Sequence, residues 1–458
     1  MRKRSKKILA GVGVIIVALG TLYAAALARS TAKLREAYAT LEKDGRPMRA
    51  ADVTPEKVPD EQNAAVLYRK AASMLRAQQA GSKDLLKQLE GLSGAPFKRT
   101  DDPYKLAEQK KDIAELKQLM SQDVVAQAIS VIEQATQRPA CQFFDASAKH
   151  GLSLEPPGIE DMRNLTRVMG TKVHFEAEAG QSQKAWDMIP VLLRFADGPR
   201  NEPSVASQFS RTGMINYSCA TIQRLCEAAP PDDENYRQID GLLAGMDDVQ
   251  PLVRAVDAER LLLGEWLFNL PDDELFEMLR KNPWGMKDTE PGPSYRLTFR
   301  LATIRPRFVA DHAAYLQIMS KSTQLLQRSY VPRESQEYKE IESLTSHHFA
   351  TDKLAPALWG IQWFAYRTVA NVRITRAGLA SFRYKQAHGT WPPSLDALDL
   401  KNVTDPFTGQ PLHYRAEGEG FLVYSVYEDQ KDNGGIVEPV EKRGGHDMVW
   451  RFPEPKTR

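Results

Sequence analysis

Cysteine is scarce in this sequence, with three in 458 residues. Cys219 and Cys226 lie seven positions apart in a predicted helix, about 10 Å along its axis, which is too far for a disulfide between them. Cys141 can pair with only one of the two, so at least one thiol is expected to stay free. We predict that Cys219 and Cys226 are small buried core residues, because no local pattern supplies the histidine that a cysteine nucleophile needs.

The sequence also lacks the motifs of common catalytic and nucleotide-binding sites. It has no glycine-rich phosphate loop, no nucleophile elbow of the form G-x-S-x-G and no H-E-x-x-H. The residue types that bind metals do occur close together, at Asp311-His312 and at His347-His348 near Glu340 and Glu342. Adjacent side chains on a helix point in different directions, however, so we interpret the histidine pair as solvated rather than as a metal site.

An excess of positive charge is missing as well, since 61 Lys and Arg face 59 Asp and Glu. Five of these basic residues fall within the first seven positions, so the remaining chain has 56 basic and 59 acidic residues and is slightly acidic. This balance excludes the basic surface on which nucleic-acid binding depends. We therefore expect no nucleic-acid partner.

What the chain does have is a basic leader followed by a long apolar run. Ile8 to Ala28 contains no charged residue, and 21 helical residues suffice to cross a hydrocarbon layer of about 30 Å. The positive leader predicts a cytoplasmic N-terminus, with everything after Arg29 on the other side. We expect a single-pass protein of the inner (cytoplasmic) membrane with its bulk in the periplasm.

A cleaved signal peptide is the alternative, because Ala26-Leu27-Ala28 is a small-x-small triplet of the kind that signal peptidase cuts. Cleavage after Ala28 would release the protein as a secreted one. The run is nevertheless longer than the roughly 7–15 residues of the apolar region of a usual signal peptide, and a helix-forming stretch, Thr31 to Glu42, follows it directly. These two features favour a retained anchor.

Helical periodicity dominates the following three hundred residues. Residues 29–150 are expected to form a helical arm, in which Asp60 caps an amphipathic helix and a second apolar stripe runs from Ile113 to Val131. The segment from Gly81 to Pro103 is interpreted as a loop with at most a short helix.

Residues 151–350 are expected to form an irregular helical bundle or solenoid. Gly180, Ala185 and Ile189 match the turn and second helix of a tetratricopeptide repeat, and Pro190 is expected to bend that helix. Further helices are predicted at 205–227 and 234–246, and a loop at 282–293.

Residues 351–458 carry the strand signals. A long helix is predicted from Pro356 to Gln386, ending before Gly389. A short helix at 395–398 and three strands follow, around 412–415, 421–426 and 448–452. The predicted unit is therefore an α+β module in which a long helix packs on a small antiparallel sheet.

The order of these features resembles the globular end of the major pseudopilin of type II secretion systems. The resemblance covers about 75 residues and is carried by Tyr384 to Gly389 with Trp391-Pro392, by the stretch from Asp405 to Tyr414, and by Tyr424-Ser425 before an acidic loop. It implies the pseudopilin fold and a calcium site, for which Asp429, Asp432 and Asp447 around Gly434-Gly435 would be the ligands.

Two departures from the pseudopilin pattern limit what is carried over. The run from Ile8 to Ala28 contains no acidic residue, whereas the prepilin-peptidase site of that family requires a glutamate. More than 300 residues also separate this run from the pseudopilin-like end. The fold is therefore expected without pilus assembly, and the whole layout resembles that of bacterial membrane-anchored envelope proteins.

The sequence thus predicts a mainly α-helical, membrane-anchored protein that acts by protein contact, as a scaffold or assembly factor. Two alternatives remain open. One is a component associated with a pseudopilus or secretion system. The other is an exported hydrolase whose site is assembled from residues distant in sequence, which would require a deep pocket with buried, mutually bonded ionisable groups.

Overall fold

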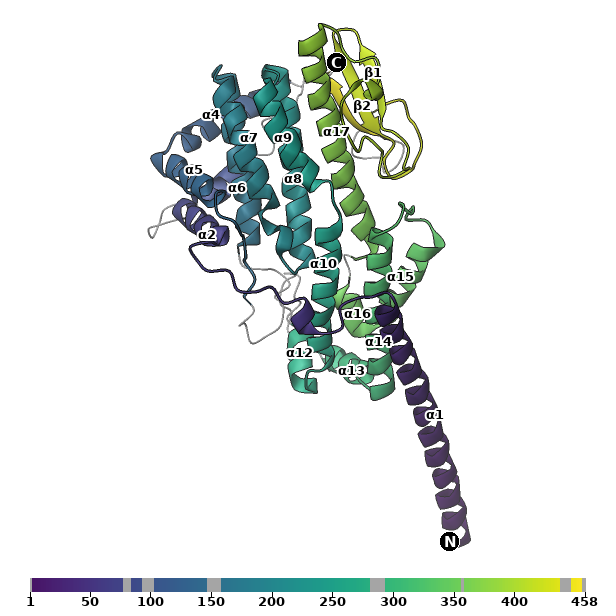
Figure 1. Cartoon of the computed structure of the whole chain (residues 1–458). Coiled ribbons are helices and arrows are strands. Elements are labelled where there is room, and N and C mark those ends of the chain that lie inside the picture. Colours follow the sequence, from purple (N-terminus) through teal and green to yellow (C-terminus); the bar gives the residue numbers. More distant parts are fainter. Residues whose placement is uncertain are drawn as a thin grey trace.

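The computed structural model describes residues 2–76, 84–92, 103–145, 158–280, 293–355, 358–436 and 446–454, and the described part of the chain is mainly helical. The expected loop at 282–293 and most of the expected loop at 81–103 lie outside these ranges. Figure 1 shows a helical body from which one helix projects, with a small sheet at the opposite end.

The projecting helix is α1 (Arg2–Lys43). It joins the apolar run and the helix-forming stretch after it into one continuous helix. Its second half packs along α14 (Arg305–Leu326), where Ser30, Ala37 and Leu41 are buried. Its first half extends away from the body (Figure 1).

The predicted arm is helical, as expected. Its elements are η1 (Ala50–Asp52), α2 (Ala64–Leu75), α3 (Leu85–Leu92), α4 (Pro103–Met120) and α5 (Asp123–Ala135). The stripe expected between Ile113 and Val131 is divided between α4 and α5 by a break at Ser121-Gln122.

The capping residue of α2 is Asn63, so the prediction of Asp60 was wrong. The Asn63 Oδ1 atom accepts from the Ala65 N–H at 3.0 Å and from the Gln142 N–H at 2.9 Å, and its Nδ2 donates to the Gln142 carbonyl at 2.8 Å. An amide both donates and accepts, so Asn63 can cap the helix and also bind the backbone of Gln142. An ionised aspartate has no N–H group and could not donate to the Gln142 carbonyl.

The array after the arm is also helical. In chain order it contains α6 (Ile159–Glu178), α7 (Ser182–Asp197), η2 (Gly198–Asn201), α8 (Val205–Ala228), α9 (Asp233–Met246), α10 (Gln250–Glu259), a π-helical turn η3 (Arg260–Gly264), α11 (Glu265–Phe268), α12 (Asp272–Arg280), α13 (Pro293–Ala302), α14 and α15 (Gln336–Ser346). Gly180 has φ +74°, as the predicted turn between α6 and α7 requires. Pro190 lies inside α7, which continues to Asp197.

The C-terminal module has the predicted α+β architecture. It consists of α16 (Phe349–Leu354), η4 (Leu358–Gly360), α17 (Ile361–His388), η5 (Leu395–Ala397), β1 (His413–Glu417), β2 (Gly420–Ser425) and β3 (Met448–Phe452). The strands form one antiparallel sheet in the order β1-β2-β3, with His413 opposite Tyr424 and Val423 opposite Trp450. The helix begins at Ile361, five residues later than predicted.

The sheet lies close to α17 at one glycine. A Cβ atom added to Gly378 would come within 1.9 Å of the Trp450 ring. Phe382, one helical turn further on, makes edge contacts with Phe421 and Phe452. A residue without a side chain at 378 therefore allows the indole of β3 to pack directly on the helix.

The apolar core is continuous across the predicted segments. One cluster joins α2, α3 and α5 to α6–α9, the second half of α17 and the sheet. A second cluster joins the packed half of α1 to α10, α14 and the start of α17. The long helix of the C-terminal module is thus part of both cores.

The cysteines behave as predicted. All three are free, and Cys219 and Cys226 are buried in α8.

Candidate functional site

The first feature with functional meaning is the uncovered half of α1. Its residues from Gly11 to Thr21 are all exposed, and Val14, Val17 and Leu22 are 66–70% exposed. The helix is long and apolar enough to span a membrane, although by length and composition a signal sequence passes the same test. Burial on the body begins at Ser30, two residues after the apolar run ends.

The packed half of α1 is fixed to the body by polar contacts as well. The Tyr38 hydroxyl donates to both carboxylate oxygens of Glu265 at 2.9 Å, and His312 Nε2 lies 3.4 Å from the same carboxylate. Burial alone would raise the pKa of Glu265, but the His312 contact, the Tyr38 bond and the charge of Arg260 together lower it. Arg46, just beyond the helix, forms a salt bridge with the buried Asp257.

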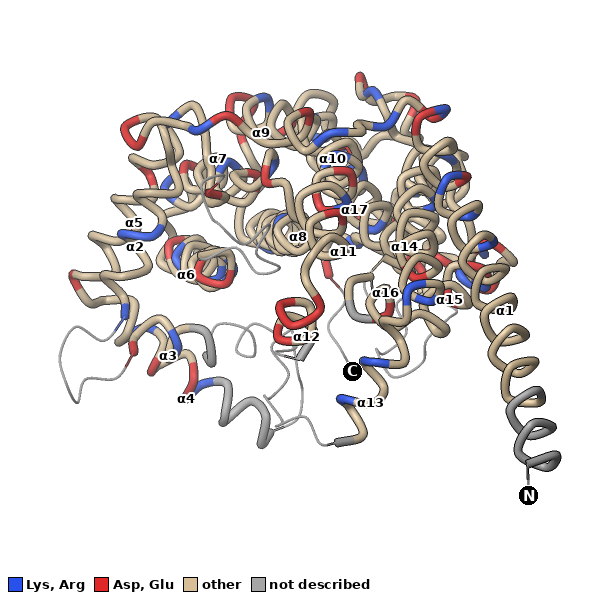
Figure 2. Tube along the Cα trace, turned by 90° about the horizontal axis from the view of Figure 1, so that it is seen from below, with Lys and Arg blue, Asp and Glu red and all other residues tan. Residues whose placement is uncertain are grey.

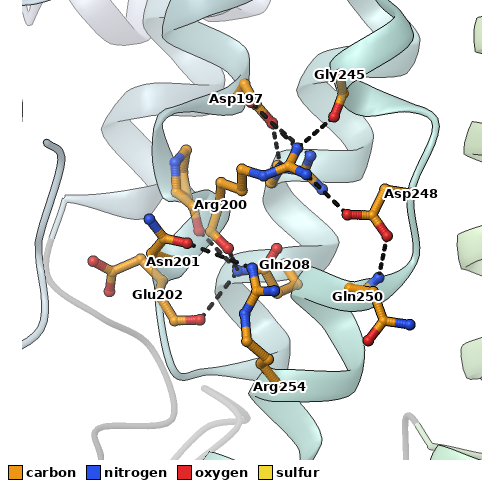
Figure 3. Close-up of polar contacts among 11 residues, drawn as sticks. Asp197, Arg200, Asn201, Glu202, Gln208, Gly245, Asp248, Gln250 and Arg254 are labelled. Atoms are coloured by element: carbon orange, nitrogen blue, oxygen red, sulfur yellow. Dashed lines mark hydrogen bonds and ion pairs between the residues drawn. The ribbon is translucent and has the colours of Figure 1, made fainter. Parts of the chain in front are cut away.

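The second feature is a partly buried ionic network between α7–η2, α8 and the α9–α10 turn (Figure 3). We call it the Arg200 network. Arg200 donates to Asp248 at 2.9 Å and to the Gly245 carbonyl at 2.7 Å, and Arg211 donates to Asp197 through Nε at 2.7 Å. Gln208 Nε2 donates to the Pro199 carbonyl at 2.7 Å, which fixes the 3₁₀ turn. Every contact in this network joins one helix or turn to another.

Two buried carboxyl groups adjoin this region. Glu202 accepts from the Phe143 N–H at 2.6 Å, and Glu259 accepts from the Val205 N–H at 2.9 Å. Burial raises the pKa of each carboxyl to about 7, and the N–H bonds offset only part of that effect. Perturbed carboxyls occur in many active sites, but they need substrate access to act.

The space beside the Arg200 network is too small for a substrate. The cavity lined by Gln208, Arg211 and Asp248 holds about 10 Å³, which is room for about one water molecule. The buried ionic groups here therefore act in packing between helices. The deep pocket that the hydrolase alternative requires is not found at this network.

A larger hollow of about 490 Å³ opens between α13, the start of α14 and the α15–α16 turn. It is lined by Thr298, Leu301, Ala302, Arg307, Ala310, Asp311, His347, His348 and Phe349. Asp311 faces α16 and accepts from the Ala350 and Thr351 N–H groups at 2.8 and 2.9 Å, so it caps that helix from α14. The remaining polar groups are cationic or neutral, which suits a ligand with negative charge and apolar parts.

The structure places three of the metal-ligand residues noted in the sequence, Asp311, His347 and His348, on the lining of this hollow, and His312 and Glu340 outside it. His312 is buried and stacks on Phe268 at 4.4 Å, whereas His347 is exposed and contacts the Ser343 carbonyl at 2.9 Å. Among the described residues there is no group of three or more His, Cys, Asp or Glu side chains able to hold a metal ion. Glu340 lies 2.9 Å from Lys321, in an exposed salt bridge.

The three acids of the predicted calcium site lie in one loop but do not converge. Asp432 accepts from the Gly434 N–H at 2.8 Å, Asp447 accepts from the Gly435 N–H at 2.8 Å, and Asp429 accepts from the Lys431 N–H at 3.1 Å. Asp432 and Asp447 thus hold the two sides of the Gly434-Gly435 turn. Each of these oxygens already accepts from an N–H group, with which a bound cation would compete, and the calcium site stays a prediction of the resemblance.

Sequence reasoning missed a set of ion pairs that joins α17 to α9, which we call the arginine ladder. Arg373 pairs with Asp247 at 2.9 Å, and Arg376 with Asp240 and Arg383 with Asp233 each at 2.7 Å. As the arginines advance along α17, their aspartate partners fall at successively earlier positions of α9 and its C-terminal end, so the two helices are antiparallel. The signal was present in the sequence, since the three aspartates are spaced by seven residues and so share one helical face.

A second missed residue is Asp405, which is 1% exposed. Its carboxylate accepts from the Phe407 N–H, the Val426 N–H and the Ser425 hydroxyl, each at 2.9 Å. Burial raises the pKa of this carboxyl, and the three bonds offset only part of the effect. Asp405 therefore fixes the 405–411 turn to the end of β2.

These features define a mainly helical protein with one exposed apolar N-terminal helix and a small C-terminal α+β module. No protein-family model, curated protein or solved structure matches the chain. Its function is therefore argued from its own residues.

Proposed function

We propose that the chain is a single-pass, membrane-anchored protein that carries its helical body on the extracytoplasmic side and acts there by protein contact. The observation that carries the anchor is the division of α1. The described side chains of its apolar half are exposed from Gly11 to Ala26, and its polar half is packed along α14 and bonded through Tyr38 to Glu265. A helix that only directs export needs no such attachment to the folded body.

Protein contact is favoured over catalysis by what the ionisable groups do, and in the 490 Å³ hollow the one carboxylate of the lining, Asp311, caps α16. The Arg200 network and the arginine ladder use their charges between helices, and the cavity at the network has room for only about one water molecule. The body is therefore a rigid support that the anchor holds near the membrane.

The pseudopilin-like tail supports a role in an envelope assembly, as a second form of the same proposal. Its long helix and three-stranded sheet have the order of that family's globular end. Because α17 is clamped to α9, the tail would be presented as part of the body rather than as a free module.

Photocrosslinking in membranes tests the contact role. A photoreactive residue is placed at exposed positions of the body, such as Lys184 and Arg237, and at buried Leu192 as a control. We expect discrete adducts of one partner from neighbouring exposed positions and none from the control. If no exposed position across α5, α7 and α9 gave an adduct, the contact role would be contradicted.

A further inference from the structure

The residues 293–310, which form α13 and the start of α14, are unusual in this protein. We call them the α13–α14 corner. Outside α1, the described residues include five exposed large hydrophobic side chains, and three of them lie here: Leu297, Leu301 and Ile304, which are 60%, 46% and 42% exposed. A soluble surface scatters such residues, so three within eight positions need a reason.

Two of the three apolar residues share one helical face. Leu297 and Leu301 lie four positions apart on α13, which places them on one side of that helix. Ile304 lies in the bend between α13 and α14 and is exposed as well. The opposite side is already used, because Tyr295 and Phe299 contact Phe276 of α12. The three exposed side chains belong to none of the core clusters among the described residues.

Basic residues flank these apolar side chains without any acidic ones. The corner contains Arg296, Arg300, Arg305 and Arg307, all exposed, and no Asp or Glu. An apolar stripe beside arginines is the pattern of helices that lie in the headgroup region of a membrane. The acidic first turn of α12, Asp272 to Glu274, is on the neighbouring helix, farther from α1 in both views (Figures 1 and 2).

Measured along the axis of α1, the corner also lies at the level where the membrane surface is expected. The helices α1 and α14 run in the same direction, because Tyr38 contacts His312 and Asp44 accepts a bond from Gln324. Arg305 precedes His312 by seven residues, and Thr31 precedes Tyr38 by the same number. At about 1.5 Å per residue, Arg305 is therefore level with Thr31, three residues beyond the end of the apolar run.

From these observations we propose that the α13–α14 corner is a second membrane contact, which inserts Leu297, Leu301 and Ile304 into the headgroup region of an anionic phospholipid bilayer. The arginines bind the lipid phosphates. Together with α1 it gives the body two points of attachment, which fixes its orientation to the membrane. The inference rests on the proposed function in one respect, because it requires α1 to span the bilayer.

Three exposed isoleucines provide a matched test in the full chain. Ile16 lies in the apolar half of α1, Ile304 in the corner, and Ile436 beside the sheet at the opposite end, with exposed fractions of 63%, 42% and 57%. Each is replaced singly by cysteine in a Cys141→Ala background and labelled with an environment-sensitive fluorophore. Cys219 and Cys226 are buried and stay unlabelled. The labelled chains are reconstituted into bilayers containing anionic lipids, with and without lipids brominated high in the acyl chain.

We expect bromolipid to quench the label at 16 and at 304 and to leave the label at 436 unchanged. Quenching at 16 with none at 304 would overturn the second contact and leave the anchor intact. No quenching at 16 would overturn the anchor and the inference together.

A charge variant separates docking from mere proximity. Each arginine near an anionic surface contributes about fivefold to the equilibrium between docked and undocked states. Arg300→Gln with Arg305→Gln should therefore lower that ratio by about 25-fold and reduce the quenching at 304 while the label at 16 remains quenched. Unchanged quenching at 304 in this variant would contradict the role of the arginines, and an unchanged melting temperature shows that the fold is intact.

Discussion

The arginine ladder makes a sharp prediction, because its rungs differ in burial while their chemistry is the same. The Arg376 and Asp240 side chains are 7% and 21% exposed, whereas those of Arg383 and Asp233 are 45% and 50% exposed. Arg376→Met removes a buried charge partner, and Arg383→Met removes an exposed one of identical type.

The expected magnitudes follow from this difference. Breaking a fully buried ion pair costs about 3–5 kcal/mol, since the remaining charge is left without a partner. Asp240 reaches solvent in part, so we expect about 2–3 kcal/mol for Arg376→Met. Arg383→Met should cost about 0–1 kcal/mol, as exposed pairs do.

Thermal unfolding of the full chain in lipid nanodiscs measures both variants. At about 2.1 cal/mol/K of unfolding entropy per residue, 1 kcal/mol corresponds to about 1 °C in a chain of this size. We expect Arg376→Met to lower the melting temperature by about 2–3 °C and Arg383→Met by less than about 1 °C. Adding Asp240→Leu to Arg376→Met should restore much of the loss, because no buried charge then remains unpaired. Equal effects of the two single variants would refute the ladder as a buried clamp.

Three further predictions concern packing, pH and calcium. Gly378→Ala should destabilise the protein by about 1–3 kcal/mol, because the added Cβ would overlap Trp450. Gly241 is a helical glycine at which an added Cβ would have no atom within 4 Å, so Gly241→Ala should stabilise the protein by up to about 1 kcal/mol. A urea titration in which Gly378→Ala is the more stable of the two variants would contradict the packing of Trp450 on α17. Glu202 and Glu259 have folded pKa values of about 7 against 4.5 for an ordinary glutamate, so the folded state binds more protons and stability should fall as pH rises from about 4.5 through 7. Glu202→Gln with Glu259→Gln should flatten that fall in denaturation curves at pH 5 and pH 8, and an equally steep fall in the variant would disprove the assignment. Because the carboxylates of Asp432 and Asp447 face N–H groups, we expect calcium to leave the melting temperature unchanged; a chelator-sensitive rise that is lost in Asp429→Ala with Asp432→Ala would instead support the calcium site implied by the pseudopilin resemblance.

Local sequence patterns predicted helices, turns and strands correctly where these depend on residues close together in the chain. The uncharged run at 8–28, the hairpin turn at Gly180 and the three strands at the C-terminus all depend on near neighbours, and they occur as expected. The burial of Cys219 and Cys226 followed from their apolar helical surroundings.

The features that could not be predicted from the sequence depend on contacts between segments that are distant in the chain. Asn63 replaces Asp60 as a cap because it also binds Gln142, and Asp311 is buried because it caps a helix that begins 38 residues later. The ladder pairs residues more than 120 positions apart. A sequence pattern shows which residues share a face, but not which faces meet.

The central claim is that α1 stays attached and holds the body at a membrane. Intact-mass analysis of the protein in carbonate-washed membranes tests it most directly. We predict a single species of about 51.4 kDa that retains residues 1–28 and resists extraction. A shorter species that begins after Ala28 and is found in the soluble fraction would contradict the account.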